Sequence, residues 1–352
     1  MTLHMGVWTP LPHTIKAEPR MEAAVERLQR RGSAQGPEDA YEFALEVLQR
    51  GERHGFEITL VAARHLGPDL DAWVLASALA ARTSTMKIMV AAHPGIHTPQ
   101  MIAKMAASLD RISGGRAAIN VVNGWNVDEF TLFGNGAWLP EAEDRHRRMD
   151  EFVQVMKGMW NDEPLDFDGK YYHVENGLMP LKIAGDTPPG LYATSQSPEG
   201  METIARYCDH WFLADKGDFR KFDETLGFVR QQIAAMEKLA GGFGRRLGYC
   251  MSANVVCADT EDEAVRQAEA LEEYGRIRRY NKSAAAGVGA CLVGTPQTIA
   301  DRLRRYEDAG LDLMLFQFSP MIEGLDNFIE KVLPLLGRGS QATVRAAGAG
   351  RR

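Results

Sequence analysis

The sequence predicts a single (β/α)8 barrel, because eight short apolar runs alternate with longer segments of helical periodicity. Strand–helix alternation along a whole chain implies parallel strands. Eight repeats of similar size suit a closed barrel better than the alternative, an open doubly wound sheet. The expected strands are His4–Thr9, Glu57–Ala62, Lys87–His93, Ala117–Val122, Gly190–Thr194, Asp209–Leu213, Gly248–Cys257 and Leu313–Phe318.

Two of the intervening helices carry clear start signals. Thr98–Ile112 and Thr295–Ala309 both open on Thr-Pro, and apolar residues repeat on one face of each. A threonine hydroxyl caps free backbone N–H groups, and proline fits the first helical turn. These segments are therefore expected to be barrel helices.

Two segments depart from a minimal barrel. Thr131–Tyr192 is too long for one unit: a helix is expected over 140–160, and Asp166–His173 then predicts a hairpin or extended excursion of the kind that covers a site. The run Tyr274–Gly289 resembles a mobile lid. The expected organisation is one barrel domain over residues 1–337, with insertions near 131–190 and 274–290. Residues 338–352 are predicted to be a disordered tail rich in Gly, Ala and Arg.

Composition excludes several classes of partner. The chain has 352 residues, 45% of them hydrophobic, and a net charge of -7, which argues against binding to nucleic acid or to an anionic membrane. Its four cysteines are spaced too widely for a CxxC motif, so neither a disulfide framework nor a zinc site is expected. Because no run approaches the roughly 18 apolar residues of a membrane span, we expect a cytoplasmic protein.

Candidate site residues are polar side chains just after the expected strands, because a barrel's site forms at the carboxyl ends of its strands. A lone histidine is most often structural or exposed. Here the repeated placement of histidines at strand ends favours His65 and His93 as pocket residues. The strand-end candidates are His13, Arg64, His65, His93, Asn120, Asn123, Ser195, Gln196 and Ser197.

Other site classes have little support. HExxH and GxSxG are absent, and the loops show no His/Cys cluster or carboxylate pair at metal spacing, so no metal is expected. The run Thr194–Gly200 ends a strand and opens a helix, where hydroxyls and free N–H groups favour an anion. It reads either as a phosphate seat or as an ordinary serine cap.

Seven stretches in the order of a known family carry a resemblance. They are Asp71–Ala80, His93–Pro99, Ser108–Arg116, Ile119–Trp125, Asp144–Phe152, Leu292–Pro296 and Pro334–Leu336. From Glu52 to Leu336 the sequence resembles the alkanesulfonate, dimethylsulfone and pyrimidine monooxygenases of the bacterial-luciferase-like superfamily.

The resemblance implies FMN bound across the carboxyl ends of the strands. Ser195, Gln196 and Ser197 would seat its phosphate together with His146, which stands where relatives commonly carry tyrosine. Asn120 maps to an asparagine near the flavin ring and O2, and Asn123 belongs to the same motif. On this mapping the candidate proton donors or substrate anchors are His13, His65 and His93.

The resemblance is weaker for the substrate. Alkanesulfonate monooxygenases carry Arg and His on the seventh strand and a further Arg, where this chain has Ser252, Asn254 and Ala285. A sulfonate is therefore doubtful, and a sulfone, heterocycle or amide-like molecule is favoured. Arg276, Arg278 and Arg279 offer an anion site or a solvated helix face. The expected substrate contacts are Trp8, Trp125 and Arg279.

The implied activity is that of a two-component monooxygenase. No GxGxxG unit is visible, so FMNH2 is expected from a separate NAD(P)H:flavin reductase. Reduced flavin would react with O2 at C4a or N5 and oxygenate the substrate. A homodimer or homotetramer is expected. The alternatives are a deazaflavin-dependent hydride-transfer enzyme and a barrel that binds flavin without turnover.

Overall fold

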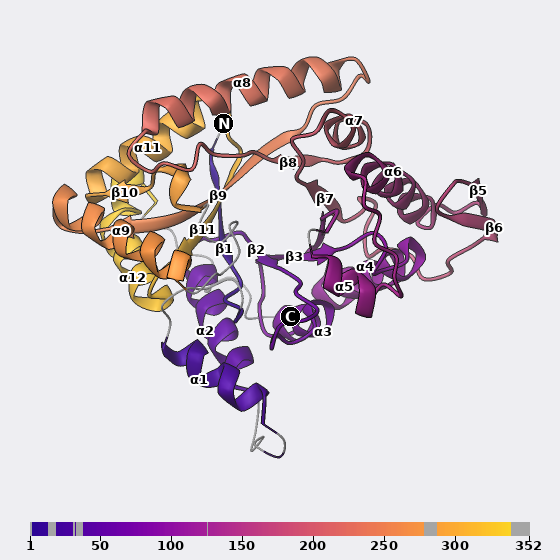
Figure 1. Cartoon of the computed structure of the whole chain (residues 1–352), viewed down its shortest axis with the longest axis horizontal. Coiled ribbons are helices and arrows are strands. Elements are labelled where there is room, and N and C mark those ends of the chain that lie inside the picture. The colour runs from indigo at the N-terminus through magenta and orange to yellow at the C-terminus, as the bar shows by residue number, and fades with distance from the viewer. Residues whose placement is uncertain are drawn as a thin grey trace, which may run out of the picture. The chain divides into compact units, whose positions relative to one another are not determined.

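The chain folds as a (β/α)8 barrel. The computed structural model describes residues 2–12, 19–30, 32, 38–124, 126–277 and 287–338. The main sheet has the order β10-β9-β11-β1-β2-β3-β4-β7-β8, and an additional β9–β8 pairing closes it, which excludes the open sheet (Figure 1). The barrel strands are β1 (His4–Trp8), β2 (Ile58–Val61), β3 (Lys87–Ala92), β4 (Ala117–Val121), β7 (Gly190–Ala193), β8 (His210–Phe212), β9 (Gly248–Cys257) and β11 (Leu313–Phe318).

The helices and remaining strands also follow the predicted alternation. The helices are α1 (Pro19–Leu28), α2 (Asp39–Arg53), α3 (Ala72–Ala80), α4 (Pro99–Ser113), α5 (Val127–Leu132), α6 (Ala142–Gly158), α7 (Pro198–Tyr207), α8 (Phe222–Gly241), α9 (Glu261–Ile277), α11 (Pro296–Asp308) and α12 (Met321–Lys331). The short elements are β5 (Leu165–Asp168), β6 (His173–Gly177), β10 (Val293–Gly294), η1 (Gly287–Ala290) and η2 (Pro334–Leu336).

The predicted helix starts are confirmed. The Thr98 side chain accepts a hydrogen bond from the backbone N–H of Met101, and Pro99 occupies the first turn of α4. Thr295 caps α11 in the same way. Each cap satisfies a backbone donor that the helix leaves free, so these two sequence signals fix where the helices begin.

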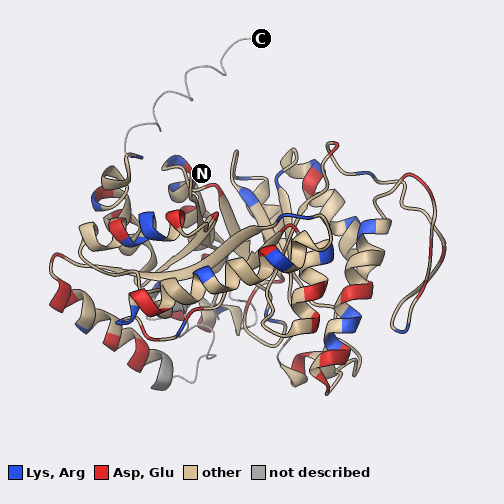
Figure 2. Cartoon of the chain, turned by 90° about the horizontal axis from the view of Figure 1, so that it is seen from above, with Lys and Arg blue, Asp and Glu red and all other residues tan. Residues whose placement is uncertain are grey.

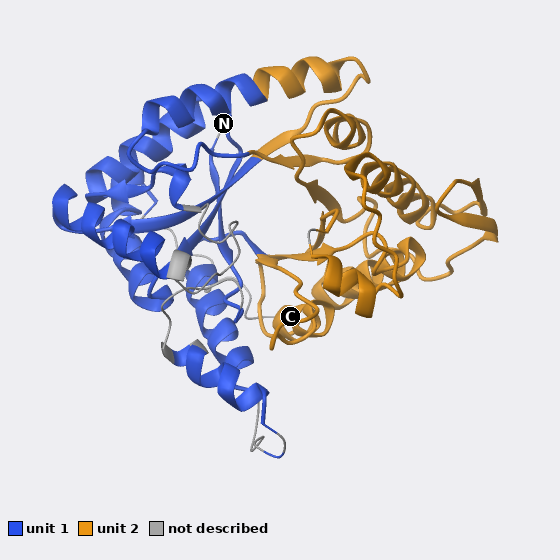
Figure 3. Cartoon of the chain, viewed as in Figure 1, with its two compact units in different colours: residues 1–59, 214–232, 250–352 blue, residues 60–213, 233–249 orange. Residues whose placement is uncertain are grey.

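The chain divides into two compact units, which Figure 3 colours separately. Unit 1 comprises residues 1–59, 214–232 and 250–352, and within it β11 pairs in parallel with β1 and with β9. Unit 2 comprises residues 60–213 and 233–249, and within it β3, β4, β7 and β8 pair in parallel in that order. The expectation of one domain over residues 1–337 stays a prediction.

The predicted excursion in the 131–190 insertion is a two-stranded antiparallel hairpin. Strands β5 and β6 pair around its turn. The carboxylate of Glu151 on α6 accepts hydrogen bonds from the backbone N–H groups of Lys170, Tyr171 and Tyr172, at 2.8 to 3.1 Å. These bonds hold the hairpin turn against α6.

The expected lid and tail fall largely outside the described residues. Residues 274–277 belong to helix α9, whereas 278–286, including Arg278, Arg279 and Ala285, are not described, and neither are 339–352. Among the described helices, none is long and apolar enough to cross a membrane. Lysine, arginine and acidic residues are interspersed along the helices in Figure 2. All four cysteines are free, and three of them are buried.

Candidate functional site

The predicted site residues of unit 2 gather because three parallel strands end at one edge. Ala92 of β3 is in register with Val121 of β4, which is in register with Ala193 of β7. The residues that follow these positions therefore emerge side by side at the carboxyl edge. This register brings together the polar residues after β3, β4 and β7.

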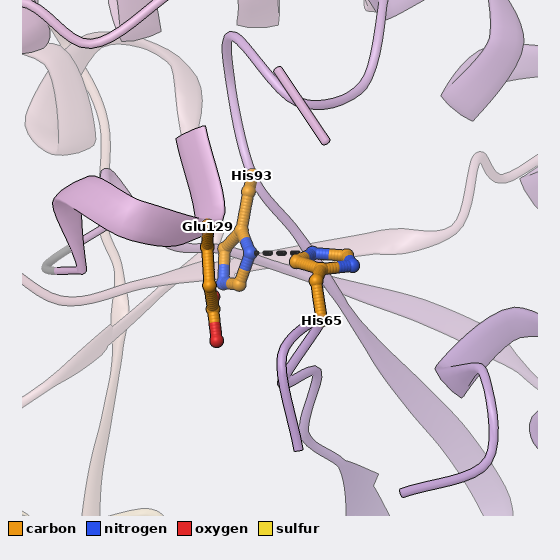
Figure 4. A group of neighbouring side chains, drawn as sticks. All are labelled: His65, His93 and Glu129. Atoms are coloured by element: carbon orange, nitrogen blue, oxygen red, sulfur yellow. Dashed lines mark hydrogen bonds between the residues drawn. The ribbon is translucent and has the colours of Figure 1, made fainter. Parts of the chain in front are cut away.

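His65 and His93 form the centre of a histidine cluster. His65 follows β2 and His93 follows β3, and their Nε2 and Nδ1 atoms lie 3.1 Å apart in a hydrogen bond (Figure 4). Their rings meet edge to face at 5.3 Å. His97 lies 5.4 Å from the His65 ring, and Phe133 lies 5.6 Å from it. One imidazole must donate and the other accept, so the pair shares a proton.

His97 is held as a neutral base. The backbone N–H of His93 donates to His97 Nδ1 at 3.1 Å, which places the proton of the neutral ring on Nε2. Burial, together with the neighbouring His65, lowers the pKa of His97 to about 4. Burial also lowers the pKa of His65. Burial therefore disfavours the charged forms of both imidazoles.

Glu129 joins this cluster from the short helix α5. It is 2% exposed, and its Oε1 lies 3.5 Å from the N–H of Leu66 and 4.0 Å from Nε of Arg64. Donor atoms of His65, His93 and Glu129 lie within 4.8 Å of one another, a set that a divalent cation could use. The sequence did not predict this cluster, because its members come from three separate segments. Partners within the protein already contact these side chains: His65 and His93 bond each other, and Arg64 lies near Glu129.

Two asparagines at the end of β4 carry buried polar atoms without partners. Asn120 is 7% exposed, and its Oδ1 makes no hydrogen bond to any residue that the structure describes. In Asn123 both Oδ1 and Nδ2 are buried and likewise unpaired among those residues. A buried amide without a partner costs on the order of 1–3 kcal/mol, so these atoms are suited to a polar ligand.

A serine–histidine cluster follows β7, where the sequence predicts a phosphate seat. Ser195 Oγ lies 3.1 Å from His146 Nε2, and Ser197 Oγ lies 3.3 Å from the same ring. Ser197 caps α7 by accepting from the backbone N–H of Gly200 at 3.2 Å. Burial lowers the pKa of His146. Gln196, also predicted here, has an exposed side chain.

The backbone of this seat requires glycine at position 200. A Cβ there would lie 2.1 Å from Ser195 Oγ and 2.6 Å from the His146 ring. The indole N–H of Trp211 fixes the loop from the other side by donating to the carbonyl of Ser195 at 3.0 Å. The hydroxyls, the imidazole and the helix start form a cradle of the kind that binds phosphate.

The remaining predicted site residues lie elsewhere. Trp8 lies in unit 1, where its indole N–H donates to Ser252 Oγ of β9 at 3.3 Å. Asn254 is 3% exposed on the same strand. The candidates His13, Trp125 and Arg279 lie outside the described residues.

Three candidate functional residues were not predicted from the sequence. His97 stands in the His93–Pro99 stretch, and its burial could not be inferred. Glu129 is buried through tertiary packing of α5. Arg148, 5% exposed, had a usable signal: it shares the buried face of α6 with Phe152 and Met156, a position that periodicity assigns to an apolar residue.

Comparisons with known proteins identify the family of this chain. The model of the family described as luciferase-like monooxygenase matches residues 21–313. An FMNH(2)-dependent dimethylsulfone monooxygenase from Pseudomonas putida is 28% identical over 323 residues, which cover 82% of this chain and 86% of the relative.

Solved structures share the fold at low identity. EDTA monooxygenase from Chelativorans sp. BNC1 has a TM-score of 0.74 and 18% identity, with 98% of each chain covered. An F420-dependent secondary alcohol dehydrogenase has a TM-score of 0.70 and 19% identity, with 97% of this chain and 100% of that chain covered. At such identities these structures support the fold alone.

Proposed function

Because this chain belongs to the luciferase-like monooxygenase family, we propose that it uses FMNH2 and O2 to oxygenate a small organic molecule. The observation that carries the proposal is the set of buried, unpaired amide atoms of Asn120 and Asn123. They follow the strand edge that also positions the histidine cluster and the serine–histidine cradle. A flavin offers ring atoms for the amides and a phosphate for the cradle.

The residues present fit FMN at two points. Ser195, Ser197 and His146 would bind the phosphate, together with free backbone N–H groups at the start of α7. Asn120 and Asn123 would bind the ring system. Reduced FMN, when bound, supplies the electrons that activate O2, with one oxygen atom entering the product and the other leaving as water.

The chain's own residues would orient the reactants and handle protons. The His65 Nε2–His93 Nδ1 pair can donate or accept a proton at these two atoms, and burial disfavours the charged form of His65. His97 keeps its Nδ1 occupied by a backbone N–H, so only its Nε2 can take part. The Asn120 amide, buried beside this edge, orients polar atoms and excludes water.

The partners follow from the same proposal. FMNH2 would come from a separate NAD(P)H:flavin reductase, as expected of a two-component system. Neutral side chains at Ser252 and Asn254 support a sulfone, heterocyclic or amide-like substrate rather than a simple alkanesulfonate. The cytoplasmic location, the homo-oligomeric state and the roles of His13, Trp8, Trp125 and Arg279 stay predictions.

The test is oxygen uptake by the purified chain with FMN, NADH and an added flavin reductase, with catalase present to discount free peroxide. We expect candidate substrates to stimulate uptake and to yield a product heavier by one oxygen atom or cleaved at a C–S or C–N bond. Asn120→Ala should keep oxygen uptake but lose product. Parallel titration with deazaflavin tests the alternative: tight deazaflavin binding, with no FMN-dependent product, would overturn the proposal.

A further inference from the structure

A cavity in unit 2 lies beside the histidine cluster. It measures about 390 Å³, a volume that suits one small organic molecule. Its walls come from the loop before α4, the loop before α6, α6 itself and the hairpin turn. The side chains that matter are those of His97, Trp138, Arg148, Tyr171 and Tyr172.

Arg148 projects from the buried face of α6 with one edge of its guanidinium unpaired. Its Nη1 donates to the carbonyl of Ala137, whereas Nε and Nη2 are buried and have no hydrogen-bond partner within the part of the chain that the structure describes. Nε and Nη2 form one edge of the planar guanidinium, and their N–H groups point in parallel directions. That edge matches the two oxygens of a carboxylate.

Among the described residues, no carboxylate forms an ion pair with Arg148. Burial lowers its pKa, and the groups that act on it through their charge are Tyr172, Tyr171 and Arg145, with no carboxylate among them. The Phe130 ring, 5.5 Å from Cζ, gives a weak cation–π contact. A buried cation of this kind is costly unless an anion pairs with it.

The backbone beside this guanidinium leaves room for it because position 95 is a glycine. Gly95 has a φ of +98°, and a Cβ there would lie 2.4 Å from Arg148 Cζ. The hairpin turn also brings Tyr172, whose buried hydroxyl has no hydrogen-bond partner among the described residues. Tyr171 donates to Asp144 at 2.8 Å and Lys170 to the same carboxylate at 3.0 Å, which fixes the turn.

This site is separate from the serine–histidine cradle. His146 and Arg148 are two residues apart on α6, and residues at that spacing point to different sides of a helix. His146 faces Ser195 and Ser197, whereas Arg148 faces Gly95 and Ala137. One helix therefore presents His146 and Arg148 to two different surroundings.

We propose that the Arg148 pocket is a carboxylate subsite, and that the substrate class is a small organic acid with an apolar body. The carboxylate would dock on Nε and Nη2 and accept a further hydrogen bond from the Tyr172 hydroxyl, with Trp138 and Tyr171 flanking the body. A heterocyclic or amide-like acid satisfies this site and the strand-end residues together. The assignment to the substrate rests on the proposed function, but carboxylate binding itself does not.

The binding test uses benzoate and its neutral isostere benzamide, titrated calorimetrically into the full chain without flavin. We expect benzoate to bind at least about tenfold more tightly, because a charge-assisted bidentate pair is lost with the amide. Arg148→Met should abolish this preference, Arg148→Lys should restore part of it, and Arg206→Met, on an exposed arginine of α7, should leave it unchanged. Equal binding of the two probes, or an undiminished preference in Arg148→Met, would overturn the subsite.

A turnover test separates this inference from the proposed function. Organic acids and their amides are compared as stimulators of FMNH2-dependent oxygen uptake. Carboxylate preference in binding with no oxygenation of any acid, while amides are oxygenated, would overturn the substrate class and leave the monooxygenase intact. If carboxylates bound preferentially but no compound stimulated oxygen uptake, the proposed monooxygenase activity and the substrate role would be wrong. The carboxylate-binding site itself would stand.

Discussion

The polar groups on the two sides of helix α6 differ in whether they are hydrogen-bonded. On the His146 side, the imidazole and the hydroxyls of Ser195 and Ser197 bond one another at 3.1 to 3.4 Å. On the Arg148 side, two guanidinium donors and the Tyr172 hydroxyl are buried without partners. The cradle is thus preorganised and stable without a ligand, whereas the Arg148 pocket stores an unfavourable charge. A ligand should change stability more at Arg148 than at His146.

Gly95→Ala is expected to have the largest effect, because it attacks the Arg148 side directly. The new Cβ would collide with the Arg148 guanidinium, and the alanine would also have to adopt the positive φ of Gly95. We expect a loss of about 2 to 4 kcal/mol in the free energy of unfolding, measured by urea denaturation, and loss of benzoate binding.

Gly114→Ala, at the C-terminal cap of α4 and outside the pocket, is the matched control for that substitution. Gly114 has a φ of +70°, but its Cβ would meet nothing within 4 Å. It should cost only about 1 to 2 kcal/mol, the strain of the left-handed conformation. Equal losses for the two variants would show that the Arg148 collision is not real.

Acid should lower the stability of the folded chain through His97, which lines the same pocket. The pKa of His97 falls from 6.5 to about 4 on folding because burial disfavours its charged form. Between these values the unfolded chain binds a proton that the folded chain does not, so stability is full above pH 6.5 and falls as pH drops toward 4. The loss attributable to His97 is about 2 to 3 kcal/mol.

His97→Asn should flatten the stability profile in that window, as followed by denaturation at each pH. His54→Asn, on an exposed histidine, is the control. Benzoate should also shift the acid unfolding transition of the wild type to lower pH, because a carboxylate beside His97 favours its protonated form in the folded chain and so reduces the stability lost to acid. A profile that His97→Asn leaves unchanged would contradict the role given to His97.

The double variant Ser195→Ala/Ser197→Ala tests the cradle side and should have the smallest effect on stability. It should weaken FMN binding about 10- to 100-fold, the loss of charge-assisted bonds to phosphate. Riboflavin, which lacks the phosphate, should bind the variant and the wild type equally in fluorescence titrations.

Ser108→Ala provides the control, because this serine only donates to the Lys104 carbonyl within α4. If riboflavin binding fell as far as FMN binding, the cradle would not be a phosphate site.

The sequence was sufficient for the fold because its signals are local. Each of the eight barrel strands is an apolar run whose predicted ends agree with the structure to within one or two residues, and the Thr-Pro caps placed α4 and α11. Strand ends also led to His65, His93, Asn120 and Ser195, because register alone brings them to one edge.

The missed residues depend on packing between distant segments. Glu129 is buried only because α5 lies beside the loop after β2. Arg148 becomes a ligand candidate only when its unpaired edge is known, although its place on the apolar face of α6 was visible. Trp8 was predicted as a substrate contact, and that role stays a prediction; in the structure its indole bonds Ser252 within unit 1.

The most direct test of the account is whether the two sides of α6 bind their anions at the same time. Benzoate is titrated calorimetrically into the chain alone and into the chain saturated with FMN. Two separate sites predict the same stoichiometry and an affinity that changes by no more than about threefold. If FMN instead displaced benzoate competitively, the Arg148 pocket and the cradle would be one anion site, and the account would be wrong.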